Sequence, residues 1–571
     1  MNKRFASLSF LSLFLFSIVF TTSIFPCTVI LVTKGASQNN SVIIAHTDDS
    51  NIEDDKRIVY VPAADYSTGA KRNISYTMWG FPRYSGTDRG PNYTLLPNHP
   101  GTPVYGTIDQ VAHTYAYFDA NYAIVNEEGV AIAETTCASK FLYKSSNQML
   151  FEITELTRIA LERARTAREA IEIIGALAEK YGYFDWGELL IIADKNEGWV
   201  FEISASPKGF GTLWVAKKVP DGEVFVAANE FRIREIAKRD PDLLYSKDLF
   251  QIAEEQNWLK NGDTFDWLES VSPGEYYHPY YSLRRVWRAQ TKINPSLYLS
   301  PWVENGYTKE YPFSIKPQKK LTIQNIASIF RDYYQDTEFD LSKHLSAGPF
   351  GCPYRYKGPY DPQMNIPGAP RLPIVGAWER PISTATCGYS HIVELRSDLP
   401  KPLASIAWIG LDQPLTCCYM PFYVGINNLP KSFSTFAAFK FNSKTAWWAF
   451  NFVSNLAASK FSYMIKEIRG KQKRIENVEF RKINEIETKA LALYEQDPSK
   501  VSAFLTDYCL NNADKVVNEW WDFSFYLFEK YANGSVNLPK PLKEVGYPEE
   551  WLDGVHYYQR GPISYKNNTN Q

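Results

Sequence analysis

Cys27 is the residue of this chain best placed to do chemistry. It follows a segment laid out like a secretion signal: basic Lys3 and Arg4, an apolar stretch from Leu8 to Phe20, and small polar residues at 21–23. Removal of everything before Cys27 would leave one residue with both a thiol and a free α-amine. Such a residue contains a nucleophile together with the base that activates it.

The expected processing takes two cuts. Small residues favour signal-peptidase cleavage after Ser23, which leaves Ile24-Phe25-Pro26 as a short pro-segment. A second cut, autocatalytic or external, would then expose Cys27. Pro26 argues against a lipoprotein site, and the Leu8–Phe20 stretch is short for a membrane span of about 20 residues. We therefore expect an exported protein that is periplasmic, held at the cell surface or secreted.

An exposed α-amine is a suitable base for this thiol. Its ordinary pKa is about 7.7–8.0, so it accepts a proton near neutral pH, whereas a lysine near 10.4 stays protonated. The thiolate would attack an amide carbonyl to form an acyl-enzyme, which water would hydrolyse. The anionic tetrahedral intermediate needs fixed hydrogen-bond donors, and loss of one such donor elsewhere has cost about 2.7–4 kcal/mol.

The composition indicates a globular protein and excludes some functions. The 571 residues are 45% apolar with a net charge of −2, or −4 once Lys3 and Arg4 are lost, so the basic footprint of a nucleic-acid-binding protein is missing. No second apolar stretch is long enough to remain as a membrane span. The sequence does not decide whether the protein forms a homo-oligomer. We expect no metal and no cofactor, because the seven histidines are scattered without metal-binding spacing and no Walker-type loop occurs.

Six cysteines besides Cys27 leave two readings open. An even number in an exported protein permits disulfides, and buried free thiols are equally compatible with the sequence. These cysteines are Cys137, Cys352, Cys387, Cys417, Cys418 and Cys509.

A hairpin should place a carboxylate beside Cys27. Two β-type runs, Thr28–Lys34 and Ser41–His46, flank a small polar turn. If Lys34 faces Ser41, the same register sets Cys27 opposite Asp48, with Asp49 next to it. The new amino terminus would then lie close to an acidic side chain.

The remaining pattern predicts an α+β layered fold with a mostly antiparallel sheet. Residues 260–380 are rich in Pro, Gly and Tyr and read as long loops around one helix, and the charged run Lys466–Arg481 reads as a solvated helix face. We divide the chain into 1–26 (signal peptide and pro-segment), 27–440 (catalytic domain) and 441–571 (helical region and surface tail). The expected hairpins, single strands and helices are Tyr122–Val125 with Val130–Glu134, Leu189–Ala193 with Trp199–Ser204, strands at Glu223–Ala228, Ser390–Leu395, Ala404–Ile409 and Met420–Gly425, and helices at Leu150–Arg163, Thr166–Tyr181 and Ile323–Tyr334.

Several ordered motifs resemble one enzyme family. Cys27-Thr28 before an apolar strand and Ala45-His46-Thr47-Asp48-Asp49 look like the dipeptidase A family of N-terminal-nucleophile hydrolases. Secernins are similar, and penicillin V acylases and bile salt hydrolases are more distant. Further matches are Asn126–Val130, Glu134–Thr136, Ala228–Arg232, Tyr281–Arg288 and Ser390–Glu394. The resemblance implies a four-layer αββα sandwich with a C-terminal helical region, and hydrolysis of dipeptides.

The resemblance also implies roles for individual residues. Cys27 would be nucleophile and base, Asp49 would hold the amine, Asn229 would help to stabilise the oxyanion, and Arg285 would lie near the thiol or the substrate. Each has a structural alternative: a buried thiol near a cleaved terminus for Cys27, a turn cap for Asp49, a strand-end turn for Asn229, and an ion pair for Arg285.

Three further residues are expected at the substrate. His46 stands where bile salt hydrolases have arginine, and Thr136 stands near their oxyanion asparagine, so neither role carries over directly. Glu134 or Asp48 would bind the substrate amine, and Arg285 or another cation its carboxylate. Two other functions remain open: an N-acyl amide hydrolase, and a binding protein on a retired hydrolase fold that keeps residues 24–26.

Overall fold

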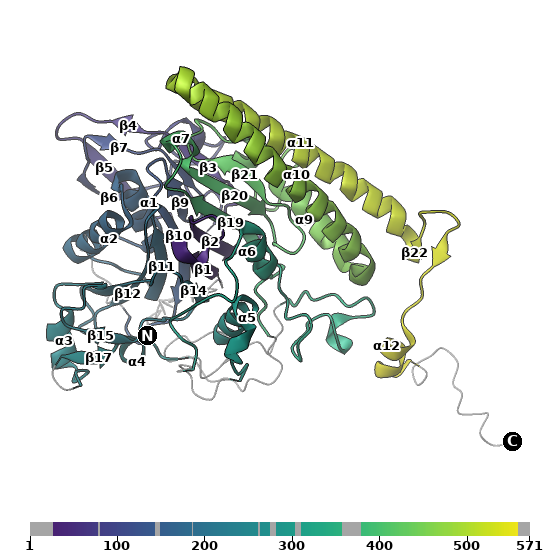
Figure 1. Cartoon of the computed structure of the whole chain (residues 1–571), viewed down its shortest axis with the longest axis horizontal. Helices are drawn as coiled ribbons and strands as arrows, with labels where there is room; N and C mark the ends of the chain where they lie inside the picture. Colours follow the sequence, from purple (N-terminus) through teal and green to yellow (C-terminus); the bar gives the residue numbers. More distant parts are fainter. Residues whose placement is uncertain are drawn as a thin grey trace, which may run out of the picture.

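The computed structural model describes residues 27–77, 80–142, 149–185, 187–260, 263–274, 281–302, 310–356 and 379–557. The expected signal peptide and pro-segment, residues 1–26, lie outside these ranges. Within them, two large antiparallel sheets pack face to face (Figure 1). In the part of the chain that the structure describes, no helix has both the length and the apolar character needed to cross a bilayer.

The first sheet has seven strands, and Cys27 directly precedes one of its inner strands, β1 (Thr28–Val32). Their order is β18 (Ser314–Ile315), β14 (Val224–Ala227), β1, β2 (Val42–Asp49), β19 (Cys387–Leu395), β20 (Ser405–Leu411) and β21 (Met420–Tyr423).

The second sheet has eight strands. Their order is β16 (Leu243–Tyr245), β13 (Thr212–Lys218), β12 (Gly198–Ala205), β11 (Gly187–Ala193), β10 (Ala131–Cys137), β9 (Ala123–Asn126), β8 (Tyr117–Asp119) and β3 (Val59–Val61). Smaller two-stranded pairs are β4 (Ala64–Asp65) with β7 (His113–Thr114), β5 (Lys71–Ser75) with β6 (Val104–Asp109), β15 (Glu235–Ala237) with β17 (Thr264–Asp266), and β22 (Ser535–Val536) with β23 (Lys543–Glu544).

Helices cover the outer face of each sheet. Helices α1 (Ile153–Arg163) and α2 (Ala167–Tyr181) pack on the eight-stranded sheet. The seven-stranded sheet is covered by α6 (Ile323–Phe330), α9 (Ala446–Ala458), α10 (Phe461–Gln496) and α11 (Val501–Tyr531). The α+β fold and its four-layer αββα order are therefore as the sequence predicts. The shorter helices are α3 (Leu249–Glu255), α4 (Trp267–Val271), α5 (Leu283–Ile293), α7 (Lys401–Ala404), α8 (Lys431–Ser434) and α12 (Glu549–Gly554).

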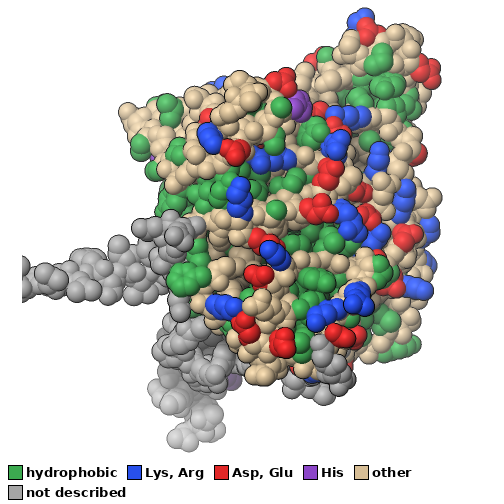
Figure 2. All heavy atoms as spheres, turned by 90° about the vertical axis from the view of Figure 1, so that its left-hand side faces the viewer, with side chains coloured by type: hydrophobic (Ala, Val, Ile, Leu, Met, Phe, Trp, Pro, Cys, Tyr) green, Lys and Arg blue, Asp and Glu red, His purple; other side chains and the backbone are tan. Residues whose placement is uncertain are grey.

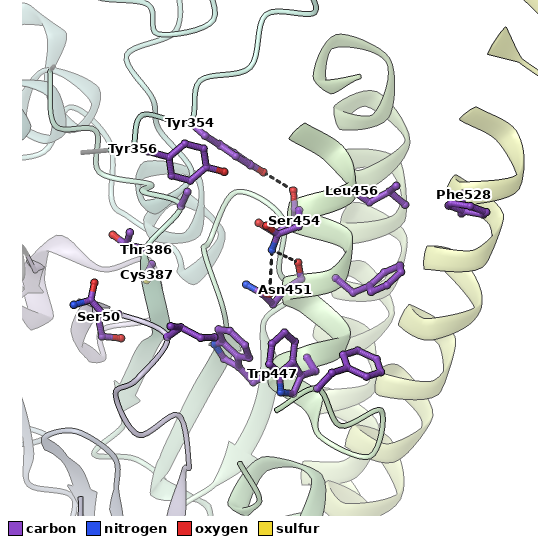
Figure 3. Close-up of a pocket in the computed structure, with 17 residues that line it drawn as sticks. Ser50, Tyr354, Tyr356, Thr386, Cys387, Trp447, Asn451, Ser454, Leu456 and Phe528 are labelled. Carbon is purple, nitrogen blue, oxygen red and sulfur yellow. Dashed lines mark hydrogen bonds between the residues drawn. The ribbon is translucent and has the colours of Figure 1, made fainter. Parts of the chain in front are cut away.

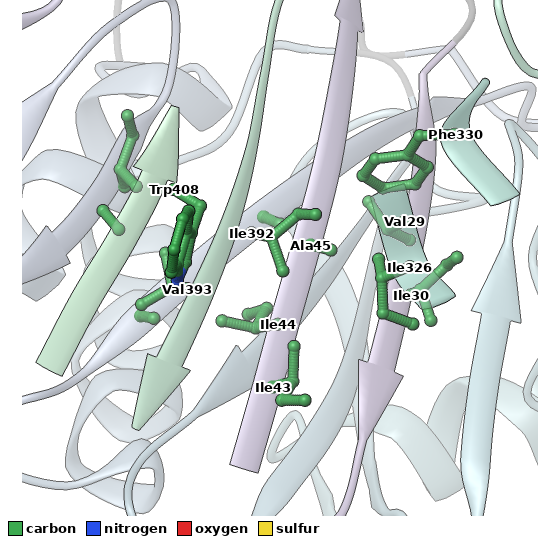
Figure 4. Packing of buried hydrophobic residues seen from close by; sticks show 14 of the residues in the cluster. Val29, Ile30, Ile43, Ile44, Ala45, Ile326, Phe330, Ile392, Val393 and Trp408 are labelled. Atoms are coloured by element: carbon green, nitrogen blue, oxygen red, sulfur yellow. The ribbon is translucent and has the colours of Figure 1, made fainter. Parts of the chain in front are cut away.

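Strand alternation decides which side chains face the second sheet. Ile392 and Trp408 are direct neighbours across β19 and β20, and Trp408 stacks on Phe480 of α10 with ring centroids 4.3 Å apart, so this row points outward (Figure 4). Leu31 points inward against Gly198 of β12, where a Cβ would lie 2.6 Å from its side chain. Only glycine leaves room for this close approach of the sheets.

The expected hairpin register is confirmed. Thr28 pairs with Thr47 and Val29 with His46, the register that sets Cys27 opposite Asp48. Both strands are buried on both faces, so a slip by one residue would not expose the apolar run but would separate Cys27 from the side chains of His46 and Asp48.

The ends of α2 are largely as expected. The Thr166 side chain accepts from the Glu169 backbone N–H, and Gly182 ends the helix at φ +79°. The Thr166–Glu169 spacing is that of a capping box, but its return bond is absent here, since the Glu169 carboxylate accepts from the Arg165 backbone N–H instead of that of Thr166.

Two sequence expectations are wrong. Residues 260–380 are not only loops around one helix: α4 and α5 lie there too, and the apolar positions Leu283, Val286, Trp287 and Ile293 of α5 have helical spacing. The charged run of α10 is not a purely solvated face, because α10 lies between the sheet and α11 and its Lys471, Glu476 and Glu479 are buried.

All seven cysteines are described and none forms a disulfide, which favours the free-thiol reading. On the face seen in Figure 2, acidic and basic side chains are intermingled over the sandwich.

Replacing Glu476 by alanine should destabilise the protein. The Arg331 guanidinium, just after α6, donates to both carboxylate oxygens of Glu476, one at 3.1 Å, and the backbone N–H of Tyr419 donates at 3.0 Å. Loss of one partner of a buried pair leaves the other charge uncompensated and costs about 3–5 kcal/mol. Denaturant unfolding measures this loss. The exposed Lys466→Ala on the same helix is the control, and equal stability of the two variants would refute the proposed tie between α6 and α10.

Candidate active site

Cys27 directly precedes β1 and is held there by its main chain. Its carbonyl oxygen accepts from the Arg285 guanidinium at 2.8 Å and from the Thr135 hydroxyl at 3.2 Å. The side chain is 1% exposed. In this uncleaved chain the Cys27 nitrogen belongs to the peptide bond with Pro26, so the thiol is described here without its expected base.

Arg285 on α5 is the cation that reaches Cys27. Besides the Cys27 carbonyl, its guanidinium donates to the Thr28 hydroxyl at 3.1 Å, the Asn229 side-chain oxygen at 2.8 Å and the Tyr281 carbonyl at 2.7 Å. It therefore ties together the beginning of β1, the end of β14 and the start of α5.

The sequence of α5 does not show which of Arg284, Arg285 and Arg288 faces Cys27. In the structure the other two arginines contact different groups. Arg284 lies over the Phe339 ring at 3.6 Å and pairs with Glu379, and Arg288 pairs with Asp332.

Asn229 braces the same region from the end of β14. Its backbone is in the left-handed region at φ +57°, which asparagine tolerates better than most residues. Its N–H donates to the Thr135 hydroxyl at 2.8 Å, and its side-chain amide donates to the Thr136 carbonyl at 2.7 Å. The structure thus brings Asn229 to Cys27 and shows it fixing both β10 and Arg285.

Asp49 lies beside the thiol, as expected. Its backbone N–H hydrogen-bonds the Cys27 sulfur. One carboxylate oxygen accepts from Arg380 at 3.3 Å, and Oδ1 is buried with no hydrogen-bond donor among the residues that the structure describes. Burial raises the pKa of this carboxyl to about 7 against the opposing effect of Arg380 and Arg285.

The thiol is neutral in this state. Burial raises the pKa of Cys27 well above its ordinary value, and Glu134, Asp48 and Asp49 raise it further, while the Asp49 N–H lowers it. Deprotonation therefore needs a local base.

Glu134 and Thr136 lie on the opposite face of β10 from Thr135. The Thr136 hydroxyl donates to Glu134 at 2.8 Å, and Glu188 stands directly across from Thr136 on β11. Burial raises the pKa of Glu134 to about 7, and burial together with the Glu134 charge raises that of Glu188 well above its usual range. Two adjacent buried carboxyl groups favour a shared proton.

His46 is enclosed by aromatic rings. It lies on β2 directly opposite His391, with ring centroids 5.3 Å apart, and meets Tyr389 at 5.9 Å and Tyr122 at 6.1 Å. Burial, and then His391, lower the pKa of His46 well below its ordinary value. A neutral imidazole does not replace the arginine charge found in bile salt hydrolases.

The sequence interpretation missed three neighbours of the site. Thr135, not Thr136, carries the hydroxyl that touches Cys27, and strand alternation from Glu134 could have distinguished the two. The position of Glu188 next to Thr136 could have been predicted from the pairing of β10 with β11. No motif in the sequence marks Arg380 as a neighbour of the site.

A cavity of about 700 Å³ is lined by Ser50, the residue after Asp49, and by Thr386 and Cys387 (Figure 3). Thr386 at its wall accepts from Arg380 at 3.4 Å, the same guanidinium that contacts Asp49. Across from it, α9 and α11 supply four aromatic side chains, Trp447, Trp448, Phe452 and Phe528, together with the polar Asn451, Ser454 and Asn455.

A comparison with known proteins identifies the family of this chain. The model of "Peptidase family C69" covers residues 26–474, which is most of the chain. The chain belongs to peptidase family C69. The resemblance to dipeptidase A is thereby confirmed, as is the prediction of a peptidase.

Several relatives of this C69 peptidase carry dipeptidase names. A probable dipeptidase of Latilactobacillus sakei is 24% identical over 76% of this chain and 81% of its own length. A probable dipeptidase A of Streptococcus pyogenes is 23% identical over 72% and 77%. Among solved structures, penicillin V acylase from Agrobacterium tumefaciens is 12% identical over 70% of this chain and 86% of its own, with a TM-score of 0.28.

The Glu134–Glu188 pair should make stability depend on pH. A folded-state pKa of about 7, above the ordinary 4.5, means that the native state binds the extra proton, so stability falls as pH rises from about 4.5 through 7. Glu134→Gln removes this titration and should gain roughly 1–3 kcal/mol relative to the wild type between pH 5 and pH 8. Urea unfolding at the two pH values measures it, with exposed Glu338→Gln as control. Parallel pH profiles of wild type and Glu134→Gln would contradict the shared-proton arrangement.

Proposed function

We propose that this C69 peptidase is an exported dipeptidase whose Cys27 becomes the amino-terminal residue and acts through its own thiol and α-amine. The observation that carries the proposal is the fixation of the Cys27 carbonyl by Arg285 and Thr135, which holds this one residue at the meeting point of β1, β10 and α5. The dipeptidase names of the relatives and the start of the family match at residue 26 support it.

The proposed reaction follows from a neutral thiol beside a new amine. The α-amine takes the thiol proton, the thiolate attacks the peptide carbonyl, and the proton passes to the leaving amine as the C–N bond breaks. Water then attacks the thioester with the amine again as base, and the thiol is restored. The unpartnered Oδ1 of Asp49 is available to accept from the α-amine and orient it.

Arg285 acts as a positioning residue in this proposal. Its guanidinium donates to four groups of the protein. Arg380 is only partly buried and contacts both Asp49 and Thr386 at the cavity wall. Its buried Nε has no hydrogen-bond partner among the described residues. Arg380 therefore takes the role of the cation that binds the substrate carboxylate. The aromatic cavity beside it would receive a large apolar substrate side chain.

The first prediction concerns processing. Wild-type protein should begin at Cys27, while Cys27→Ala should keep Ile24-Phe25-Pro26 and lose dipeptide hydrolysis by more than about a thousandfold, since the nucleophile is gone. Intact mass, amino-terminal sequencing and a dipeptide assay measure this, with the buried Cys509→Ala on α11 as the matched cysteine control.

Two results would overturn the proposal: an active protein that starts upstream of Cys27, or equal dipeptide hydrolysis by Cys27→Ala. Competition of dipeptides against N-acyl amino acids in the same assay separates a dipeptidase from an acylase. A chain that keeps residues 24–26 and hydrolyses neither class would be the binding protein.

A second prediction tests the cavity. Trp448→Ala should raise KM about five- to tenfold for dipeptides with a large aromatic residue, change it little for Ala-Ala, and leave kcat nearly constant, because aromatic packing is lost only for large side chains. Steady-state kinetics on both substrates measure the split. Phe525→Ala, on an exposed part of α11 outside the cavity lining, is the control. An equal KM change for both substrates would show that the cavity does not select the side chain.

A further inference from the structure

Three metal-binding side chains converge at the nucleophile. The Cys27 sulfur, a His46 ring nitrogen and an Asp48 carboxylate oxygen all lie within 4.8 Å of one another, and all three residues are buried. They come from the start of β1 and from alternate positions of β2, so the hairpin register points them to the same side of the sheet.

His46 is the member whose state is otherwise unexplained. It is 0% exposed, and its ring interacts with the backbone of Glu134, but neither ring nitrogen makes a well-formed hydrogen bond to the residues that the structure describes. A buried imidazole that is not fully hydrogen-bonded is costly, and histidine is the commonest metal ligand in proteins. Its ring is fixed by packing against His391, Tyr389 and Tyr122.

Asp48 is held in place by a hydrogen bond from a neighbouring amide. One of its carboxylate oxygens accepts from the Asn121 amide at 2.6 Å. Outer hydrogen bonds of this kind hold a ligating carboxylate in place.

We propose that this cluster binds one thiophilic divalent cation, of which zinc is the representative, through Cys27, His46 and Asp48. Thiolate, imidazole and carboxylate are the ligand types of zinc sites, and small movements would bring the three atoms to the usual distances of about 2.0–2.3 Å. Binding forms a metal–sulfur bond and releases the thiol proton to solvent. After removal of residues 1–26, the α-amine of Cys27 completes a four-ligand set by closing a five-membered ring with the thiolate.

The consequence is reversible inhibition. A cation bound to the sulfur occupies the electron pair with which Cys27 attacks the substrate and shields the thiol from oxidation. This consequence rests on the proposed function, whereas the binding site itself does not.

Cobalt(II) is the probe for the test, because its thiolate complexes absorb by charge transfer in the near ultraviolet. Titration of the purified, metal-free mature protein should give a saturable band at one cobalt per chain, reversed by excess zinc. His46→Gln and Asp48→Asn should each weaken binding more than about tenfold, and Cys27→Ala should abolish the band. His113→Gln, at an exposed surface histidine, is the control and should leave the titration unchanged.

Circular dichroism checks that each variant folds. If either His46→Gln or Asp48→Asn fails to fold, the other variant still tests the site. A missing band in the wild type, or equal cobalt affinity in folded His46→Gln or Asp48→Asn, overturns the proposal. Dipeptide hydrolysis that zinc stops and a chelator restores supports the inhibitory role. A band in a protein that hydrolyses no dipeptide would leave the metal site standing and refute only the proposed function.

Discussion

The site depends on the hydrogen bonds that hold the carbonyl of Cys27. This oxygen accepts from Arg285 on α5 and from Thr135 on β10, two segments far from Cys27 in the sequence. Arg285 in turn holds Asn229, and Asn229 holds Thr135 through its backbone N–H. The four residues form a closed ring of hydrogen bonds, in which each member fixes the position of the next.

Several titratable side chains around this ring are held wholly or partly in their neutral forms. The carboxyl groups of Asp49 and Glu134 have pKa values raised to about 7 by burial, and His46 is held neutral. Near Cys27 the acidic groups disfavour a thiolate, whereas the Asp49 backbone N–H at the sulfur and the Arg285 guanidinium at the carbonyl are donors held in fixed positions. Such groups need no reorganisation when charge develops on a reacting oxygen, which is how preorganised sites lower barriers.

The parts of this site that were predictable are those set by local pattern. The small polar turn after Lys34, between two short apolar runs, was enough to set Cys27 opposite Asp48, because the turn fixes which residues of a hairpin face each other. The helical spacing of Leu283, Val286 and Trp287 is also present in the sequence. The many Pro and Gly residues around this segment led us to expect a loop there instead.

Other parts depend on tertiary packing that no local pattern encodes. Three arginines stand within five positions of α5, and only the packing of α5 against β14 selects Arg285 to face Cys27. Glu476 looks like a solvated charge until α10 is placed between the sheet and α11. Arg380 reaches Asp49 across more than three hundred residues of sequence, so its role follows from the fold alone.

The raised pKa of Asp49 bears on how the proposed base would work. A fully ionised carboxylate beside the α-amine would stabilise the ammonium form and make the amine a poor acceptor of the thiol proton. In the chain before any cut, burial raises the pKa of this carboxyl to about 7, and this burial opposes its full ionisation beside a new amine. The carboxyl group can orient the amine by a hydrogen bond and still leave the amine lone pair available near neutral pH. In the uncleaved chain a peptide nitrogen occupies this position and has no basic lone pair to offer, so the same cut that creates the terminus also creates the base.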